Sequence, residues 1–222
     1  MITVQHSIHP KTICATVLAG GRGTRMGGVD KGLQDFKGHT LAWHAVQRLQ
    51  AQTGGAPGLI AINANRNLPA YAAWGQPVWP DTMEDFAGPL AGFQTALRHS
   101  QQQNTPFEYL LTVPCDSPLF PLHLLERLAL GLSASGADIA LAAIPEADRD
   151  GVTTLRAQPV FCLMRTALQA SLVDYLASGG RKIAAWTALH SLVEVPFDAA
   201  QDHPRDFSNA NTLAQLHQLE QI

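Results

Sequence analysis

The chain of 222 residues is short of cysteine, of charge and of long apolar runs, and each shortage argues against a class of protein. Its three cysteines, Cys14, Cys115 and Cys162, are odd in number and widely spaced, which argues against a disulfide framework and a zinc site. A net charge of −3 without a basic run argues against nucleic acid as a partner. No apolar run approaches membrane-spanning length, and residues 1–11 lack the apolar core of a signal peptide. We therefore expect a protein of the reducing cytoplasm with no nucleic-acid or membrane partner.

The composition that is present favours one folded domain. With 46% hydrophobic residues, a chain of this length can bury one sizeable core. From residue 13 to residue 143, apolar runs of strand length alternate with helical stretches, which predicts an α/β fold with a doubly wound, mainly parallel, Rossmann-like sheet. After a charged turn at 145–151, residues 153–163 predict an antiparallel strand that extends this sheet. We expect a flexible tail at 1–11 and a single domain over 12–222.

The stretch 18–32 concentrates glycine and positive charge directly after the apolar run 13–18, which has the composition of a buried strand. Five glycines, two arginines and one lysine fall within twelve positions. Glycine lets the backbone approach a ligand and aim N–H groups at an anion, while Arg22, Arg25 and Lys31 supply charge that suits phosphate oxygens. The pattern predicts a loop that holds a triphosphate. The alternative is a glycine-rich surface loop without a ligand.

Two common phosphate-binding loops do not fit this stretch. A Walker loop requires Ser or Thr after its lysine, whereas Lys31 precedes Gly32. A dinucleotide fingerprint that begins at Gly21 requires glycine at the position of Met26. The stretch instead resembles the motif of nucleotidyltransferases that transfer an NMP group from an NTP. The matching residues are Leu18-Ala19-Gly20-Gly21, Arg25-Met26-Gly27 and Asp30-Lys31. Within that class, the chain is most similar to the molybdenum cofactor guanylyltransferases.

This resemblance implies an enzyme that transfers GMP from GTP to the terminal phosphate of Mo-molybdopterin. Pyrophosphate would be released, and the product would be the molybdopterin guanine dinucleotide cofactor. The candidate catalytic residues are Lys31 and Arg25, whose charges would neutralise the charge that builds between the α-phosphate and the leaving pyrophosphate. On this interpretation, residues 12–143 bind GTP and Mg²⁺, and residues 144–222 form the acceptor side of a nucleotidyltransferase domain.

Three polar residues, Asn63, Asp81 and Asp116, each follow a predicted strand. In a doubly wound fold ligands bind outside the carboxyl ends of the strands, so we expect these side chains at one edge of the sheet. The carboxylate of Asp116 suits Mg²⁺, which binds few protein ligands, but a turn aspartate that bonds its own backbone is the alternative. The resemblance supports the metal role, since residues 114–118 are similar to the family's metal-binding loop, with Mn²⁺ as an alternative to Mg²⁺.

The resemblance also implies which residues contact the nucleotide. Asp81 would contact the ribose or the guanine, and Asn63 would read the base edge, but spacing does not separate Asn63 from Asn65. Gly20 favours GTP over CTP, because the related cytidylyltransferases carry alanine at that position. The implied GTP-binding residues are Leu18, Ala19, Gly20, Gly21, Gly23, Lys31, Asn63, Asp81 and Asp116.

Near the C-terminus, the segment 207–212 is similar to the family's F-x-N-x-N-T motif, which lies beside the pterin acceptor. This likeness assigns Asn209 and Asn211 to the acceptor side. Arg156 joins them, because the sequence around it is similar to another segment of the family. The alternative for the C-terminal segment is a helix cap, with Ser208 or Asn211 at the start of a last helix over 211–220.

Three other functions remain open on the sequence alone. They are a cytidylyltransferase that acts on the same cofactor, a transferase that makes a nucleotide sugar or alcohol, and a non-catalytic GTP-dependent carrier of the cofactor. The expected partners are GTP and Mo-molybdopterin as substrates, with transient contacts to proteins that supply molybdopterin and to molybdoenzymes that receive the product. We expect the protein to be a monomer.

Overall fold

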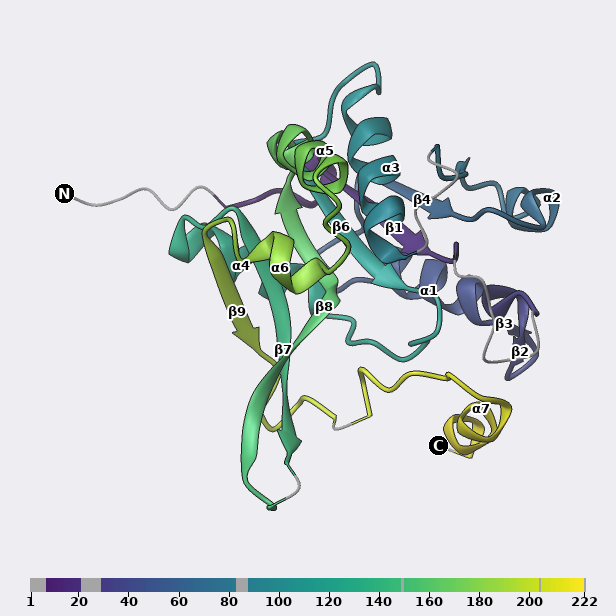
Figure 1. Cartoon of the computed structure of the whole chain (residues 1–222). Coiled ribbons are helices and arrows are strands. Elements are labelled where there is room, and N and C mark those ends of the chain that lie inside the picture. The colour runs from purple at the N-terminus through teal and green to yellow at the C-terminus, as the bar shows by residue number, and fades with distance from the viewer. Residues whose placement is uncertain (1–6, 21–28, 83–87, 149, 204, 222) are drawn as a thin grey trace.

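The computed structural model of the chain describes residues 7–20, 29–82, 88–148, 150–203 and 205–221 (Figure 1). Three of the predicted site residues, Gly21, Gly23 and Arg25, lie outside these ranges. Within the described ranges, no helix combines the length and the apolar character needed to cross a membrane.

A seven-stranded sheet organises the described part of the chain, in the order β5-β4-β1-β6-β8-β7-β9. Strand β8 is antiparallel to its neighbours β6 and β7, whereas all other neighbouring pairs are parallel. The predicted α/β fold, with a mainly parallel sheet and an antiparallel strand from the C-terminal third, is confirmed. The strands are β1 (Ile13–Leu18), β4 (Leu59–Asn63), β5 (Val78–Trp79), β6 (Tyr109–Pro114), β7 (Ile139–Ala147), β8 (Thr153–Arg165) and β9 (Leu192–Pro196).

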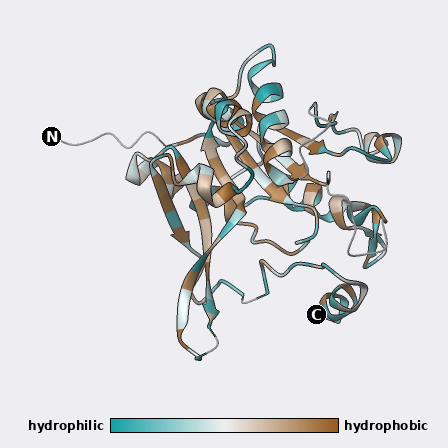
Figure 2. Cartoon of the chain, viewed as in Figure 1, coloured by the Kyte–Doolittle hydropathy of each residue, from teal (hydrophilic) through white to brown (hydrophobic). Residues whose placement is uncertain are grey.

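Helices cover both faces of the sheet (Figure 1). The α-helices are α1 (Leu41–Gln50), α2 (Leu68–Ala72), α3 (Pro89–Gln101), α4 (Leu124–Ser135), α5 (Gln169–Ala177), α6 (Ile183–Thr187) and α7 (Leu213–Glu220). Ala15 and Val17 of β1 enter the core with α1 and α4, whereas Cys14 enters the opposite core with α3, α5 and α6. Successive side chains of β1 therefore point to opposite faces of the sheet, and both faces are buried. Figure 2 shows the hydrophobic residues gathered on the central strands.

Two predicted boundaries are wrong. The turn expected at 145–151 is shorter, because β7 continues to Ala147 and pairs Pro145 with Leu155 of β8 in a hairpin. The last helix begins at Leu213, where the hydroxyl of Thr212 accepts a hydrogen bond from the N–H of Gln215 at 3.2 Å and caps the first turn.

A break in register divides β8 into a buried part and an exposed arm. Leu141 pairs with Cys162, but the next residue of β7 pairs with Gln158, so residues 159–161 have no partner in β7. Pro159 lies at this break. Proline has no backbone N–H to donate, and at this position β7 offers no partner that would need one. Beyond the break the two strands continue as an arm that leaves the sheet (Figure 1).

A small hairpin beside α1 anchors the C-terminal helix. Its strands are β2 (Asp35–Phe36) and β3 (His39–Thr40), and the turn residues Lys37 and Gly38 have φ values of 51° and 84°. Two successive positive φ values are typical of the tight turn that matches strand twist. Phe36 and Leu41 form a third cluster with Ala210, Leu216 and Leu219 of the C-terminal region. This packing places the chain that precedes α7 beside Lys31, which Asn211 contacts.

Candidate active site

The parallel strands β4, β1 and β6 bring their carboxyl ends into register. Leu18, at the end of β1, pairs with Asn63 of β4 on one side and with Pro114 of β6 on the other. The N–H of Ala19 donates to the carbonyl of Asn63 at 2.8 Å, and the N–H of Cys115 donates to the carbonyl of Leu18 at 3.1 Å. The predicted residues Leu18, Ala19, Asn63 and Asp116 therefore lie along one edge of the sheet.

Asp81 is held at this edge by a set of amide and hydroxyl donors. Asn63 Nδ2 donates to Asp81 Oδ1 at 2.8 Å, and Asn65 Nδ2 donates to Asp81 Oδ2 at 2.7 Å. Asn65 Oδ1 accepts the N–H of Asp81 at 2.7 Å, and Thr95 Oγ1 donates weakly at 3.4 Å. The two asparagines that spacing could not separate have different surroundings, because Asn63 is only 2% exposed whereas Asn65 is exposed.

Gly20 lies directly against this cluster. A Cβ atom on Gly20 would lie 2.9 Å from Asn65 Nδ2 and 3.1 Å from Asn63 Oδ1. The carbonyl of Gly20 also accepts a hydrogen bond from Asn65 Nδ2 at 3.3 Å. Glycine is therefore required here for close approach rather than for an unusual backbone angle.

Lys31 joins two distant parts of the chain. Its Nζ atom lies 2.5 Å from Asp116 Oδ2 and donates to Asn211 Oδ1 at 2.7 Å. The side chains of Lys31 and Asp116 are 21% and 18% exposed, so the pair is accessible from solvent without being fully solvated. A lysine ammonium has three donors, and two of them are directed at these oxygen atoms.

The backbone of Lys31 is positioned by its neighbour Asp30. Lys31 begins the 3₁₀ helix η3 (Lys31–Leu33), and Asp30 precedes it. Asp30 Oδ1 accepts the Tyr71 hydroxyl at 2.6 Å, and Oδ2 accepts Asn67 Nδ2 at 3.0 Å. Burial, followed by the hydrogen bond to Asp30, raises the pKa of Tyr71 above its usual value, so its hydroxyl stays a donor.

The acceptor-side asparagines lie beside the Asp116 loop. The carbonyl of Asp116 accepts the N–H of Ala210 at 2.8 Å, and Ser117 Oγ donates to Asn209 Oδ1. The helix-cap alternative for Ser208 or Asn211 is wrong, because Thr212 caps α7. The side chain of Asn211 is thereby left to accept from Lys31.

Arg156 lies apart from this group. It is exposed and pairs with Ile144 in the two-stranded arm beyond the break in β8. Among the described residues, no hydrogen bond or ion pair joins its side chain to Lys31, Asp116 or Asn211. Its acceptor-side role stays a prediction.

Cys115 is adjacent to Asp116 but is not a reactive thiol. Burial, and to a lesser degree the Asp116 carboxylate, raises the pKa of this thiol far above its ordinary value. The thiol therefore stays protonated, which argues against a nucleophilic role. Burial likewise raises the pKa of Cys14 to about 12.

Sequence reasoning missed the supporting residues of the site. Asp30 was part of the quoted motif but had no role, and Tyr71 and Thr95 were not singled out. Tyr71 lies 41 positions from Asp30, so no local pattern reveals their contact. The one available signal was the polar Asp30 directly before a candidate lysine.

Comparison with known proteins defines the class to which this fold and site correspond. The family model for the MobA-like NTP transferase domain matches residues 15–194. The molybdopterin-guanine dinucleotide biosynthesis protein A from Archaeoglobus fulgidus has a similar fold, with a TM-score of 0.69 over 94% of this chain and 97% of that chain, at 21% identity. At that identity, the likeness shows the fold alone.

Two curated relatives are much more similar in sequence. The molybdenum cofactor guanylyltransferase of Albidiferax ferrireducens is 58% identical, covering 96% of this chain and 98% of the relative. The enzyme of the same name from Acidovorax sp. is 57% identical, covering 94% and 95%. The chain therefore belongs to the molybdenum cofactor guanylyltransferases, within the MobA-like NTP transferases. The predicted nucleotidyltransferase activity is confirmed, and the alternative of a non-catalytic carrier is not supported. Transferases of this kind typically need a divalent metal ion.

Proposed function

We propose that this chain transfers GMP from GTP to the terminal phosphate of Mo-molybdopterin, forming the molybdopterin guanine dinucleotide cofactor. The observation that carries the proposal is the contact of Lys31 with both Asp116 and Asn211, at 2.5 and 2.7 Å. One cation, at the end of the stretch 18–32, thereby contacts both the Asp116 loop that follows β6 and Asn211 near the C-terminus. Two phosphate-bearing substrates require such a meeting point, because their charges must be neutralised where they react.

In this reaction, an oxygen of the acceptor phosphate attacks the α-phosphorus of GTP. The bond between the α-phosphorus and the oxygen that bridges to the β-phosphate breaks, and pyrophosphate leaves with that electron pair. A phosphate nucleophile is already ionised near neutral pH, so no general base is needed. Asp116 and Asn211 hold the ammonium of Lys31 in place, and its third donor would stabilise the developing charge.

We assign the divalent ion to Asp116 and expect Mg²⁺, with Mn²⁺ as an alternative. Within the described residues, no group of three or more His, Cys, Asp or Glu side chains gathers, so an ion that needs several protein ligands does not fit. Mg²⁺ does fit, because it binds through one or two carboxylates and takes its other ligands from phosphates and water. When bound, the ion would supply positive charge to the phosphate oxygens.

We propose that Asp81 contacts the ribose or guanine and that the asparagines hold it in place. Asn63 is almost fully buried, and its Nδ2 atom donates to both the Trp79 carbonyl and Asp81. This arrangement favours a supporting role for Asn63 over direct reading of the base. The exposed Asn65 is better placed for a contact with the nucleotide. The backbone of Leu18, Ala19 and Gly20 completes this side of the GTP site.

The direct test is pyrophosphate release from purified protein with Mg²⁺, molybdopterin loaded with molybdenum, and either GTP or CTP. We expect release that requires the acceptor and GTP, with less than about a tenth of the rate with CTP. The product should co-elute with molybdopterin guanine dinucleotide. Turnover with CTP but not with GTP would overturn the choice of base, and no release with either would overturn the proposed reaction.

Gly20→Ala tests the close approach of the loop to the Asp81 cluster. The added methyl group would push Asn65 Nδ2 away from Asp81, so we expect the KM for GTP to rise about tenfold, or about 1.4 kcal/mol. Steady-state kinetics at saturating acceptor measure this change. In an Asn65→Ala background the same substitution should cost less, because the closer of the two contacts is removed while that with Asn63 Oδ1 remains. An unchanged KM for GTP would contradict the proposed role of Gly20.

The remaining expectations stay predictions. They are the cytoplasmic location, the monomeric state, and the transient contacts with proteins that supply molybdopterin or receive the finished cofactor. The acceptor-side roles of Arg156 and Asn209 are likewise proposals that acceptor kinetics of their variants would test.

A further inference from the structure

The connection between β9 and α7, residues 197–212, is called the strap below. It holds no helix or strand among its described residues, and it runs from the β9 edge of the sheet to α7 (Figure 1). It carries both acceptor-side asparagines, Asn209 and Asn211. A segment without regular structure needs contacts outside itself to hold such side chains still. Phe207 provides an apolar anchor, because it is buried in the main core against Phe161 and Phe197. The ion pairs that attach the strap centre on Asp202.

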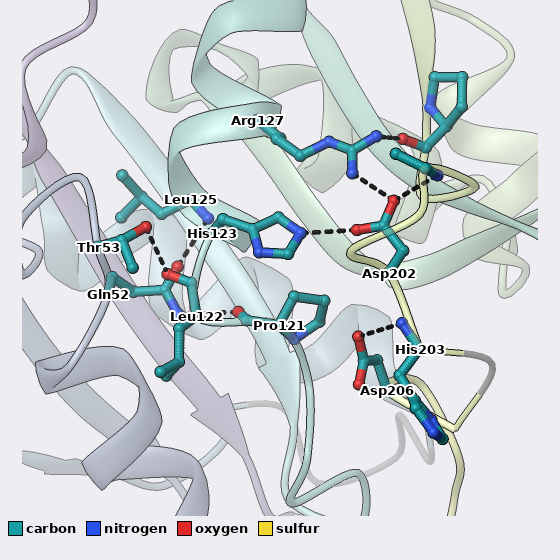
Figure 3. A network of polar contacts seen from close by, with 12 residues as sticks. Gln52, Thr53, Pro121, Leu122, His123, Leu125, Arg127, Asp202, His203 and Asp206 are labelled. Carbon is teal, nitrogen blue, oxygen red and sulfur yellow. Dashed lines mark hydrogen bonds and ion pairs between the residues drawn. The ribbon is translucent and has the colours of Figure 1, made fainter.

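Asp202 is buried among hydrogen-bond donors, as Figure 3 shows. Its carboxylate accepts His123 Nε2 at 2.7 Å, Arg127 Nη1 at 2.5 Å and the N–H of Ala199 at 2.9 Å. Its side chain is only 4% exposed. Burial alone raises the pKa of Asp202, but the hydrogen bonds from Arg127, Ala199 and His123 together lower it below its usual value. The carboxylate is therefore ionised and fully partnered in the folded protein.

Phe197 strengthens the same attachment at the start of the strap. The Arg127 guanidinium lies over the Phe197 ring, 4.2 Å from its centroid, and the His123 ring stacks on it with centroids 5.8 Å apart. Arg127 also donates to the carbonyl of Pro196. The N–H of Phe197 donates to the carbonyl of Ala143 at 2.7 Å. Arg127 and His123 thus hold both the strap backbone and its first aromatic side chain.

The two partners of Asp202 belong to the segment that also carries Asp116. His123 directly precedes α4, Arg127 lies in its first turns, and the helix follows the Asp116 loop in the chain. The far end of the strap returns to that loop, where Ala210 donates its N–H to the Asp116 carbonyl. The strap is therefore fastened at both ends to one continuous piece of the chain, residues 116–127. A fixed distance between these attachments restricts where Asn209 and Asn211 can lie.

We propose that Asp202 is a positioning residue for the acceptor side, which holds Asn209 and Asn211 against Ser117 and Lys31 without contacting either substrate. This inference deepens the proposed function and rests on it. The base and ribose side of the GTP site has no bond to the strap among the described residues, since Gly20 and Asp81 bond instead to Asn63 and Asn65. Lys31 and Asp116, on the phosphate side, do contact the strap, but their own positions are fixed by the chain before η3 and by β6. Loss of the Asp202 contacts should therefore weaken use of the acceptor far more than the binding of GTP.

The experiment compares D202N with D138N as a matched control. Asp138 accepts Ser191 Oγ at 2.6 Å and so also fastens the β9 region, but at the opposite end of the strands from the site. For D202N we expect about a tenfold rise in the KM for Mo-molybdopterin, with the Kd for GTP within about twofold of the original. Calorimetry without acceptor measures the Kd. D138N should change neither value.

A second readout is independent of activity. Hydrogen exchange of the peptide over 205–212 should be at least about tenfold faster in D202N. A loosened strap would break the hydrogen bond between the Ala210 amide and the Asp116 carbonyl more often, while exchange of the β1 peptide should be unchanged. If D202N folds poorly, R127K supplies a milder loss of the same attachment and should show a smaller effect in the same direction. In the double variant, the two changes should be less than additive.

Equal losses of GTP and acceptor binding, or the same losses in D138N, would overturn the inference in favour of general destabilisation. Unchanged exchange over 205–212 would also overturn it. If the unmodified protein releases no pyrophosphate, the proposed function fails, and the exchange experiment still decides whether Asp202 positions the strap.

Discussion

Lys31→Ala should lower turnover by about two to three orders of magnitude, or about 3–4 kcal/mol of transition-state stabilisation. The proposed function places the ammonium where the two substrates meet, and in the folded protein it already has two oxygen partners, Asp116 and Asn211. The loss should appear in kcat more than in the KM for GTP, since the charge that Lys31 neutralises grows during the reaction. Stopped-time assays of pyrophosphate release measure both constants.

The same variant should fold almost normally. The Lys31–Asp116 pair is partly exposed, so screening limits its contribution to stability to less than about 1 kcal/mol. Lys11→Ala is the matched control, because Lys11 is exposed and precedes β1 at the end opposite the site. Thermal unfolding of both variants should be close to that of the original protein. Unimpaired turnover in Lys31→Ala would remove Lys31 from the catalytic assignment.

Asp116→Asn should lower turnover by at least about 100-fold and raise the Mg²⁺ concentration needed for half-maximal rate. The substitution keeps the shape of the side chain and the backbone carbonyl that accepts the Ala210 N–H, so the strap should stay in place. What is lost is the negative charge that suits a hard cation and that pairs with Lys31. Titration of Mg²⁺ and of Mn²⁺ in the pyrophosphate assay checks this expectation.

Asp174→Asn on the exposed face of α5 is the control for a change of one charge. It should leave the metal dependence unchanged. If Asp116→Asn needed no more Mg²⁺ than the original protein and kept its turnover, Asp116 would not be the metal ligand. A lower turnover with an unchanged metal requirement would instead assign Asp116 to holding Lys31.

Much of the fold follows from local pattern. Apolar runs such as Ile13–Leu18 and Tyr109–Pro114 predict buried strands, because their side chains must leave water on both faces of the sheet. The boundaries were less predictable where a contact from elsewhere extends or shortens an element. β7 continues past Pro145 only because β8 returns beside it, and α7 starts two residues later than expected because Thr212 supplies the cap.

The site divides in the same way. The choice of Lys31, Asp116 and Gly20 as candidates followed from local pattern, since a phosphate loop requires glycine and lysine at close spacing and a strand end suits a metal-binding carboxylate. Their roles stay predictions. Their partners were not predictable. Asn211 lies 180 positions from Lys31, and Asp202 lies 75 positions from Arg127. No periodicity or spacing records such pairs.

The order of residues at 18–32 therefore predicts a triphosphate-binding loop, because the requirements for close backbone approach and positive charge are local. Its resemblance to the nucleotidyltransferase motif adds the kind of chemistry. Which side chains surround that chemistry depends on long-range packing. α7 docks on the β2–β3 hairpin, and Asp202 attaches the strap to α4, which together bring Asn211 to Lys31. Bringing together residues so far apart in the chain has a cost in conformational entropy. The packing of the sheet and its helices offsets this cost, so the contact depends on the tertiary structure.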